Sequence, residues 1–253
     1  MSVIVIGSVA GAPGATRLAL GLAAAWPVEG MRRVVVEADP DGGRLGAELG
    51  VGVEPGLMAL ALAARSAPMT PDDLLERGAT DVADWFVVAA PPSAEQAHSA
   101  LVHAASSLAD VMSRDPAGTV WIVDAGRLST RSPSMPFARV ATDVVIVTHG
   151  AFPHLQLLPH RVEALRSADC NVDVVVVEPT SWSAGEIADF VSADVIGVLP
   201  AVRVRRDDVA AMRTNAWRPW WTAVDDVAAY LARDIAPAAP RELQVLPDEA
   251  VRS

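Results

Sequence analysis

Lysine is absent from this sequence of 253 residues, in which all 20 Lys+Arg positions are arginine. Every mechanism that requires a lysine ammonium from this chain is therefore excluded. Cysteine is nearly absent as well: Cys170 is the single one, which excludes an internal disulfide and any metal site built from several cysteines. A lone cysteine agrees with a reducing compartment.

Positive charge is scarce, and the net charge is -11 at pH 7. Broad attraction to nucleic acid or to anionic lipid needs a basic face, so nucleic acid is not an expected partner. The sequence also lacks a basic stretch followed by a long apolar segment, so neither a secretory signal nor a transmembrane segment is expected. We expect a cytoplasmic protein.

What the sequence does have is a high apolar content, with 51% hydrophobic residues, and enough length to bury a full core. Apolar runs rich in Val and Ile alternate with longer stretches of helical period, which is typical of buried parallel strands joined by crossover helices. The sequence therefore predicts an α/β fold with a doubly wound, mostly parallel sheet flanked by helices. One domain is expected over residues 1–235, followed by a flexible C-terminal tail over residues 236–253.

The predicted elements follow from these two periodicities. The expected strands are Val3–Ile6, Val34–Glu37, Trp85–Val88, Val120–Val123, Val144–Val147, Val172–Val177 and Val195–Leu199. The expected helices are Thr16–Ala25, Leu57–Arg65, Pro71–Arg77, Ala94–Arg114, Leu155–Ser167, Ala184–Val191 and Val224–Arg233. Ser183, with Glu186 three residues later, predicts a capped helix start.

A glycine loop, Gly11–Thr16, follows the first predicted strand and leads into the first predicted helix. Such a loop can turn sharply and present backbone N–H groups at a helix N-terminus, where anions are stabilised. The alternative is a tight strand-to-helix turn that binds no ligand. This stretch alone does not decide between the two, because a partial glycine pattern is weak.

Acidic residues follow two other predicted strands. Glu37, Asp39 and Asp41 lie where the second strand ends, and together they can hold magnesium through water. Asp124 lies near the end of a later strand. The alternative for each acid is a turn or helix cap, but Asp39, Asp124 and the glycine loop would all meet at the ligand-binding edge of an open α/β sheet. The five histidines show no metal-binding spacing, and no nucleophile elbow or catalytic carboxylate pair is present.

The order of these motifs resembles the MinD/ParA superfamily of P-loop ATPases. The glycine loop and the acidic turn are followed by the Val-Asp-Ala-Gly run at Val123–Gly126 and by Ala141–Thr148. Within the superfamily, Ser183–Ala188 followed by Val195–Pro200 is similar to the CpaE/TadZ pilus-localisation proteins and to actinobacterial septum-site-determining proteins. The resemblance covers roughly residues 2–233.

The resemblance implies a site for ATP and magnesium. Its nucleotide-binding residues would be Gly11, Ala12, Pro13, Gly14, Ala15, Thr16 and Arg17. Magnesium would be held by Thr16, Asp39 and Asp124, and Asp39 would also serve the catalytic step. The departures concern charge: Ala10 stands where the family has its signature lysine, and Ala15 where it has its phosphate-binding lysine. Glu178-Pro179 stands where an adenine-reading asparagine often lies.

The missing phosphate lysine has an estimable cost. A charge-assisted hydrogen bond contributes about 1.5–3 kcal/mol, so its loss weakens ATP binding by about tenfold to a hundredfold while the backbone loop remains. Hydrolysis should suffer more, because the ammonium also offsets charge on the transferring phosphoryl group. We therefore do not expect an efficient ATPase. Arg17, Arg44, Arg127 and Arg131 are candidate substitutes, with solvated surface charge as the alternative for each.

Three tryptophans, Trp217, Trp220 and Trp221, lie within five residues near the C-terminus. Trp and Arg dominate protein interfaces, so this segment is a candidate partner contact. The alternative is that it packs over the sheet edge as core. Its Pro219 and its short length argue against a helix.

The leading hypothesis is a catalytically degenerate MinD/ParA-like protein that acts as a spatial-positioning or assembly scaffold. By resemblance, it would serve a polar pilus or secretion machine or septum site selection, with protein partners there and recruitment to a pole or septum. A homodimer is expected, which Ala10 would free from nucleotide control. The alternatives are a slow ATPase in which an arginine replaces the lysine, and a chromosome or plasmid partition protein.

Overall fold

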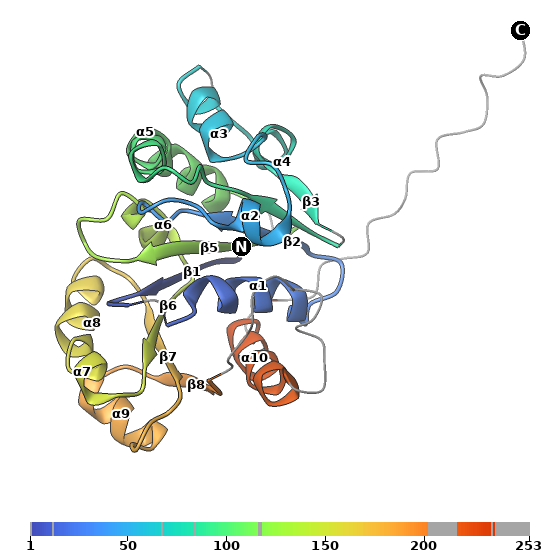
Figure 1. Ribbon diagram of the computed structural model, residues 1–253. Helices are drawn as coiled ribbons and strands as arrows, with labels where there is room; N and C mark the ends of the chain where they lie inside the picture. Colours follow the sequence, from blue (N-terminus) through green and yellow to red (C-terminus); the bar gives the residue numbers. More distant parts are fainter. Residues whose placement is uncertain are drawn as a thin grey trace, which may run out of the picture.

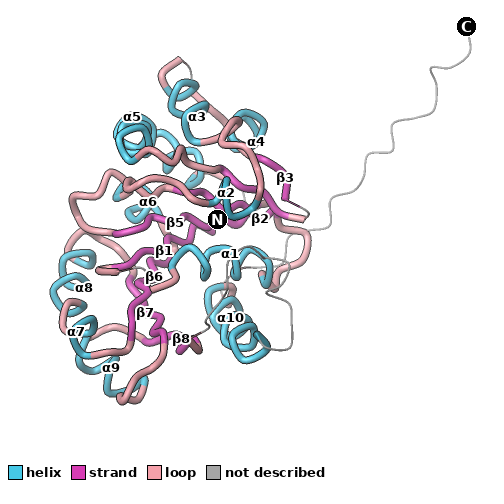
Figure 2. Tube along the Cα trace, viewed as in Figure 1, coloured by secondary structure: helices cyan, strands magenta, loops and turns pink. Residues whose placement is uncertain are grey.

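The computed structural model describes residues 2–11, 13–66, 68–82, 84–115, 118–201, 217–233 and 235. A central sheet carries helices on both faces (Figures 1 and 2). The predicted tail, residues 236–253, lies outside the described residues, so the boundary between domain and tail stays a prediction. No helix in the described part of the chain has both the length and the apolar character that crossing a membrane requires.

The sheet has eight strands in the order β3-β4-β2-β5-β1-β6-β7-β8. They are β1 (Ser2–Ser8), β2 (Arg32–Glu37), β3 (Thr80–Val82), β4 (Trp85–Val88), β5 (Thr119–Arg127), β6 (Asp143–His149), β7 (Val172–Val177) and β8 (Val195–Leu199). Every neighbouring pair is parallel except β3 and β4. The predicted doubly wound, mostly parallel sheet is confirmed. The sequence missed β3, whose three residues are too short for a recognisable apolar run.

Helices connect these strands on both sides of the sheet (Figure 1). They are α1 (Ala15–Ala25), α2 (Leu45–Leu49), α3 (Leu57–Ala64), α4 (Pro71–Gly78), α5 (Ala94–Ser113), α6 (Met135–Val140), α7 (Phe152–Leu155), α8 (Leu158–Arg166), α9 (Ala184–Val191) and α10 (Arg218–Leu231). The predicted cap of α9 is confirmed: Ser183 Oγ accepts a hydrogen bond from the Glu186 N–H at 3.2 Å, and Glu186 Oε2 accepts one from the Ser183 N–H at 2.8 Å.

The core has two layers because each central strand is buried on both faces. In β1, Val3 and Val5 pack into the layer formed with α3, α5, α6 and α8. The alternate residues Ile4 and Ile6 pack into the layer formed with α1 and α10. This alternation is why the strands read as continuous apolar runs in the sequence.

The tryptophan segment corrects the sequence prediction. α10 begins at Arg218 with Pro219 in its first turn, where a residue without an N–H is tolerated, so the segment is helical. Trp217 and Trp220 are buried, as in the alternative that this segment packs as core. These two side chains are therefore not a free surface for a partner.

Trp220 in particular holds α10 against α1. A Cβ added at Gly21 of α1 would lie 2.6 Å from the Trp220 ring, so a glycine is required for this approach. Trp220 also makes edge contacts with Trp217 and Trp221, with ring centroids 5.6 and 5.0 Å away. Trp221 is half-buried. The cluster thus closes the second core layer.

Candidate functional site

Three neighbouring strands bring the predicted site residues to one edge of the sheet. β2, β5 and β1 lie side by side (Figure 1), and the register pairs Asp124 of β5 with Glu37 of β2 and with Ile6 of β1. The glycine loop leaves β1 and Asp39 leaves β2 at this same edge. The topology therefore gathers a loop and two acids that lie far apart in the sequence.

The glycine loop has the backbone geometry that only glycine adopts easily. Gly11 has φ +68° and Gly14 has φ +103°, both in the left-handed region. Gly14 is the N-cap of α1 and supplies no side chain to accept from the first-turn N–H groups. Those donors, at the positive end of the helix dipole, are the groups that bind an anion. Ala12 lies outside the described residues.

Ala15, at the position of the missing phosphate lysine, is buried. It is 7% exposed and belongs to the core layer of α1 and α10. Pro13, two residues earlier, is buried as well. The loop therefore offers an anion its backbone donors but no cation at this position.

Asp124 is a buried acid held by the first turn of α1. It is 1% exposed, and its carboxylate accepts hydrogen bonds from the Thr16 side chain and, at 3.2 Å, from the Gly126 N–H. Burial raises the pKa of Asp124 from 3.8 to about 6, although these two hydrogen bonds lower it, and the charges of Glu37 and Asp39 raise it further. Full ionisation of the carboxyl groups at this site is therefore unfavourable unless a cation is bound.

Asp39 reaches the same place because residue 126 is a glycine. A Cβ on Gly126 would lie 2.1 Å from Asp39 Cγ. Asp39 Oδ1 accepts a hydrogen bond from the Asp41 N–H at 2.9 Å. Burial raises the pKa of Asp39, and the charges of Arg44 and Arg127 act against that rise. Both arginines are therefore close enough to act on the site.

Glu37 is not a free metal ligand, contrary to the expectation that three acids after β2 act together. Its Oε1 accepts from the N–H groups of Arg44 and Leu45, and its Oε2 accepts from the Ala90 N–H at 2.9 Å. These bonds tie the turn after β2 to the end of β4. The role of Glu37 is to hold the acidic turn in place.

The donor set at this edge fits magnesium. Thr16, Asp39 and Asp124 offer hard oxygen atoms, which this ion prefers. A cation would also offset the burial of the Asp124 carboxylate. Within the described ranges, no three His, Cys, Asp or Glu residues form a metal cage. Magnesium here would therefore depend on the Thr16 hydroxyl, water and phosphate oxygens to complete its shell.

Arg17, the residue after the loop, has its side chain near Gly14. Its Nη1 is 4.0 Å from the position a Cβ would take on Gly14. The guanidinium also lies over the Trp217 ring, 5.9 Å from its centroid. Arg17 is half-buried, unlike Arg131, which is exposed. Arg17 therefore borders the glycine loop and is held there by stacking.

His154 is a neighbour of the loop that the sequence did not single out. Its Cε1 lies 3.9 Å from the position a Cβ would take on Gly11. It also contacts His149 at the end of β6, with ring centroids 5.1 Å apart. Burial, followed by the charge of His154, lowers the pKa of His149. The only sequence signal was the position of these residues at a strand end and in the next helix.

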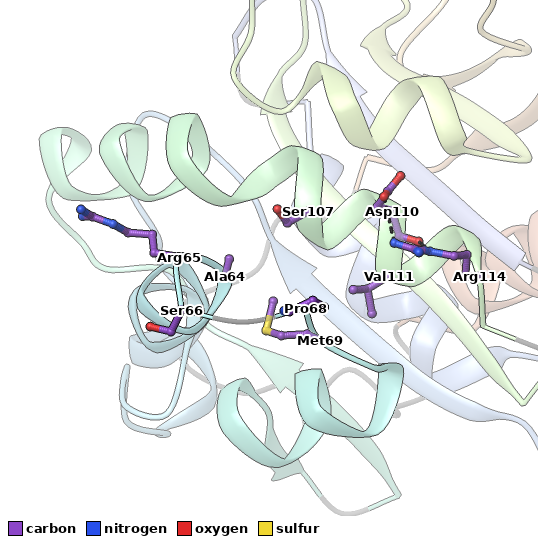
Figure 3. A pocket seen from close by; sticks show the side chains of 9 residues that line it. All are labelled: Ala64, Arg65, Ser66, Pro68, Met69, Ser107, Asp110, Val111 and Arg114. Carbon is purple, nitrogen blue, oxygen red and sulfur yellow. Dashed lines mark hydrogen bonds and ion pairs between the residues drawn. The ribbon is translucent and has the colours of Figure 1, made fainter.

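The hollow shown in Figure 3 is separate from this edge. It has a volume of about 440 Å³ and lies between the end of α3, the segment before α4, and α5, beside Met69 and Val111. An ion pair between Asp110 of α5 and Arg114, the residue that follows this helix, borders the hollow at 2.8 Å. None of the predicted site residues lines it.

Comparison with known proteins settles the fold. No protein-family model matches the chain, and no curated protein does. The ParA family ATPase from Chlorobium tepidum TLS matches with a TM-score of 0.66 at 15% identity, over 92% of each chain. The cell division ATPase MinD from Pyrococcus furiosus matches with a TM-score of 0.67 at 15% identity, over 90% of this chain and 99% of that one. The chain has the MinD/ParA fold.

The same fold also carries a different activity. The cobyrinic acid a,c-diamide synthase from Mycobacterium smegmatis, solved with a bound ATP analog and magnesium, matches with a TM-score of 0.65. It is 17% identical and the match covers 92% of this chain and 94% of that one. At such identities the likeness shows the fold alone, so function must be argued from the site.

Proposed function

We propose that this protein is a catalytically degenerate MinD/ParA-like scaffold for spatial positioning or assembly, with weak or absent ATP binding. One observation carries the proposal. The loop keeps Gly11 and Gly14 in left-handed conformations and keeps Thr16 on Asp124, yet residue 15 is a buried alanine. The parts that shape the site are present, and the charge that drives phosphoryl transfer is missing.

The remaining groups define what the site can do. Thr16, Asp39 and Asp124 would hold magnesium, and the first-turn amides of α1 would hold phosphate oxygens. Bound magnesium would supply neutralising charge to the phosphates. The chain would then bind and orient a nucleotide, but without a lysine it would stabilise the transition state poorly.

Phosphate release from ATP tests this proposal. With magnesium present, we expect the wild-type protein to release phosphate no faster than Asp124→Ala, which lacks the buried acid. Sensitivity is set by adding a working ATPase to a parallel sample. A wild-type rate clearly above that of Asp124→Ala would overturn the proposal of a silent scaffold.

The position of Arg17 favours one alternative, a slow ATPase in which this arginine replaces the lysine. Its guanidinium borders Gly14, and Arg is a good phosphate ligand. The alternative predicts phosphate release that disappears both in Asp124→Ala and in Arg17→Ala. Arg131→Ala, which removes an exposed arginine, is the matched control and should leave the rate unchanged.

We further propose that the protein forms a homodimer without nucleotide. Ala10 stands where the MinD/ParA superfamily, which this chain resembles, has the lysine that links dimerisation to ATP. Sedimentation velocity should show the same dimer with and without ATP and magnesium. A monomer that pairs only when both are added would contradict this proposal.

The cellular role that we propose is at a pole or a septum, with a pilus, secretion or division machine. A fluorescent fusion at native expression should form foci at one of these places. Uniform cytoplasmic fluorescence would argue against a positioning role.

A further inference from the structure

An exposed aromatic cluster lies on the surface formed by α7, α9 and the loop before α9. It consists of Phe152, Trp182 and Phe190, which are 51%, 42% and 43% exposed. Phe152 stacks on Trp182 with centroids 6.3 Å apart, and it lies 6.2 Å from Phe190. Within the described residues, every large aromatic side chain that is exposed belongs to this cluster.

Such a cluster is unusual for a chain that has few aromatic residues, 5% of its composition. The other described tryptophans are buried or half-buried. Three neighbouring aromatic rings that remain open to water mark an interaction site, because aromatic side chains supply much of the binding energy at interfaces. Leu157, also exposed, follows α7 and adds apolar surface beside Phe152 in the chain.

Exposed acidic residues lie on the chain segments that carry the cluster. Glu186 and Phe190 are four residues apart on α9 and so share a helix face. The hydrogen bonds from Ser183 lower the pKa of Glu186, so this carboxylate is charged at neutral pH. Asp189, three residues after Glu186 on α9, and Glu178, just after β7, are exposed as well. A partner with basic side chains would complement this rim.

We infer that the aromatic cluster is a docking site for a basic peptide segment of a partner protein, with apolar side chains on the rings and Lys or Arg on the acidic rim. A second copy of the chain fits less well, because a two-fold contact would place the same acids opposite one another. Anionic lipid would be repelled by the same acids.

The cluster lies next to the candidate nucleotide site. α7 contributes Phe152 to the cluster and His154 to the side of Gly11 in the glycine loop. Figure 1 shows α7 and α9 together at one end of the sheet. A partner docked on the rings therefore contacts the helix that borders the loop. The docking site rests on the proposed scaffold role and adds to it the class of partner.

The test is selection of displayed random dodecapeptides on the full-length protein. The enriched peptides should carry Leu, Phe or Trp flanked by Lys or Arg. A labelled synthetic copy should bind by fluorescence anisotropy, and its affinity should fall at least tenfold in Trp182→Ser and in Phe190→Ser. Asp189→Arg should weaken it severalfold. Leu62→Ser, which removes a 68% exposed apolar side chain on α3, is the matched control and should bind normally.

Three outcomes would overturn the inference. The first is that the enriched peptides are acidic. The second is that they bind the Trp182→Ser variant as tightly as the wild type. The third is that sedimentation shows a wild-type dimer that the Trp182→Ser substitution abolishes. All the changed residues are exposed, so circular dichroism should show a folded protein in each case. The assay contains no nucleotide. A protein that hydrolyses ATP but binds the peptide contradicts only the silent-scaffold proposal, and the reverse result contradicts only this one.

Discussion

Two buried aspartates on the same face of the sheet show how differently a buried acid can be used. Asp124 lies near the carboxyl end of β5, and Asp173 near the amino end of β7. Burial is the main cause that raises the pKa of each to about 6. Asp124 is 1% exposed and Asp173 is 4% exposed. By burial and by pKa alone, the two are indistinguishable.

Their polar neighbours separate them. Asp124 accepts hydrogen bonds from the Thr16 side chain and the Gly126 N–H, beside the N-terminus of α1, whose N-cap Gly14 supplies no side-chain acceptor. Within the described part of the chain, Asp173 Oδ2 has no hydrogen-bond partner. The charges of Asp143 and Asp194 raise the pKa of Asp173, and those of Arg233 and Arg166 lower it. A raised pKa therefore marks burial, and the surrounding donors identify the candidate site.

The largest effect is expected from Gly126→Val, which blocks the approach of Asp39 to Asp124. A side chain at φ +58° is strained, and its Cβ would lie 2.1 Å from Asp39 Cγ. We expect the free energy of unfolding to fall by about 2–4 kcal/mol, measured by urea denaturation. Gly185→Ala is the control, because nothing lies within 4 Å of that Cβ. Equal stability of Gly126→Val and wild type would refute the packing described at this edge.

A smaller effect of opposite sign is expected from Asp124→Asn. Its folded pKa of about 6 lies above the ordinary 3.8, so the acid favours folding below pH 3.8, and that stability is lost as pH rises through 6. The amide avoids this loss. At pH 7.5 the variant should be more stable by up to about 3 kcal/mol, with the gain disappearing near pH 4. A gain that does not depend on pH would contradict this account.

Asp173→Asn should show the same pH dependence with a smaller gain. The folded pKa of Asp173 is also about 6, but its Oδ2 has no hydrogen-bond partner within the described residues, so an amide would bury an N–H donor without an acceptor. We expect a gain of about 1 kcal/mol at pH 7.5, because a buried donor without an acceptor costs about 1–3 kcal/mol. Urea denaturation across pH 4–7.5 measures it. A gain larger than that of Asp124→Asn would reverse the comparison between the two acids.

The smallest effect is expected from Arg17→Ala, which removes the stacking on Trp217. A cation–π contact of this kind contributes about 0.5–1 kcal/mol. A thermal melt should show a slightly lower midpoint than for Arg131→Ala, whose guanidinium is exposed. If both variants melt alike, Arg17 is not held beside the loop by Trp217.

Much of the fold could be predicted because the strands are apolar runs bounded by turn residues. Trp85–Val88, Val172–Val177 and Val195–Leu199 have the predicted ends. The start of α10 could not be predicted in the same way. Pro219 reads as a helix breaker in the sequence, but in a first helical turn it starts the helix.

The candidate site was predictable in part, by the order of its motifs along parallel strands. That order led to Thr16, Asp39 and Asp124, which the topology brings to one edge. The role of Glu37 was not predictable, because its partners include Ala90, which is 53 residues away. The position of His154 beside Gly11 also depends on tertiary packing and has no local signal.

The central claim is that a formed loop lacks one charge, and restoring that charge tests it most directly. Wild type and Ala15→Lys would be titrated calorimetrically with ATP and magnesium, up to millimolar nucleotide, after melts show that both are folded. We expect Ala15→Lys to bind about tenfold to a hundredfold more tightly than wild type, which would bind weakly or not at all. Equally tight binding by wild type would contradict the claim, because the loop would then not need the missing lysine.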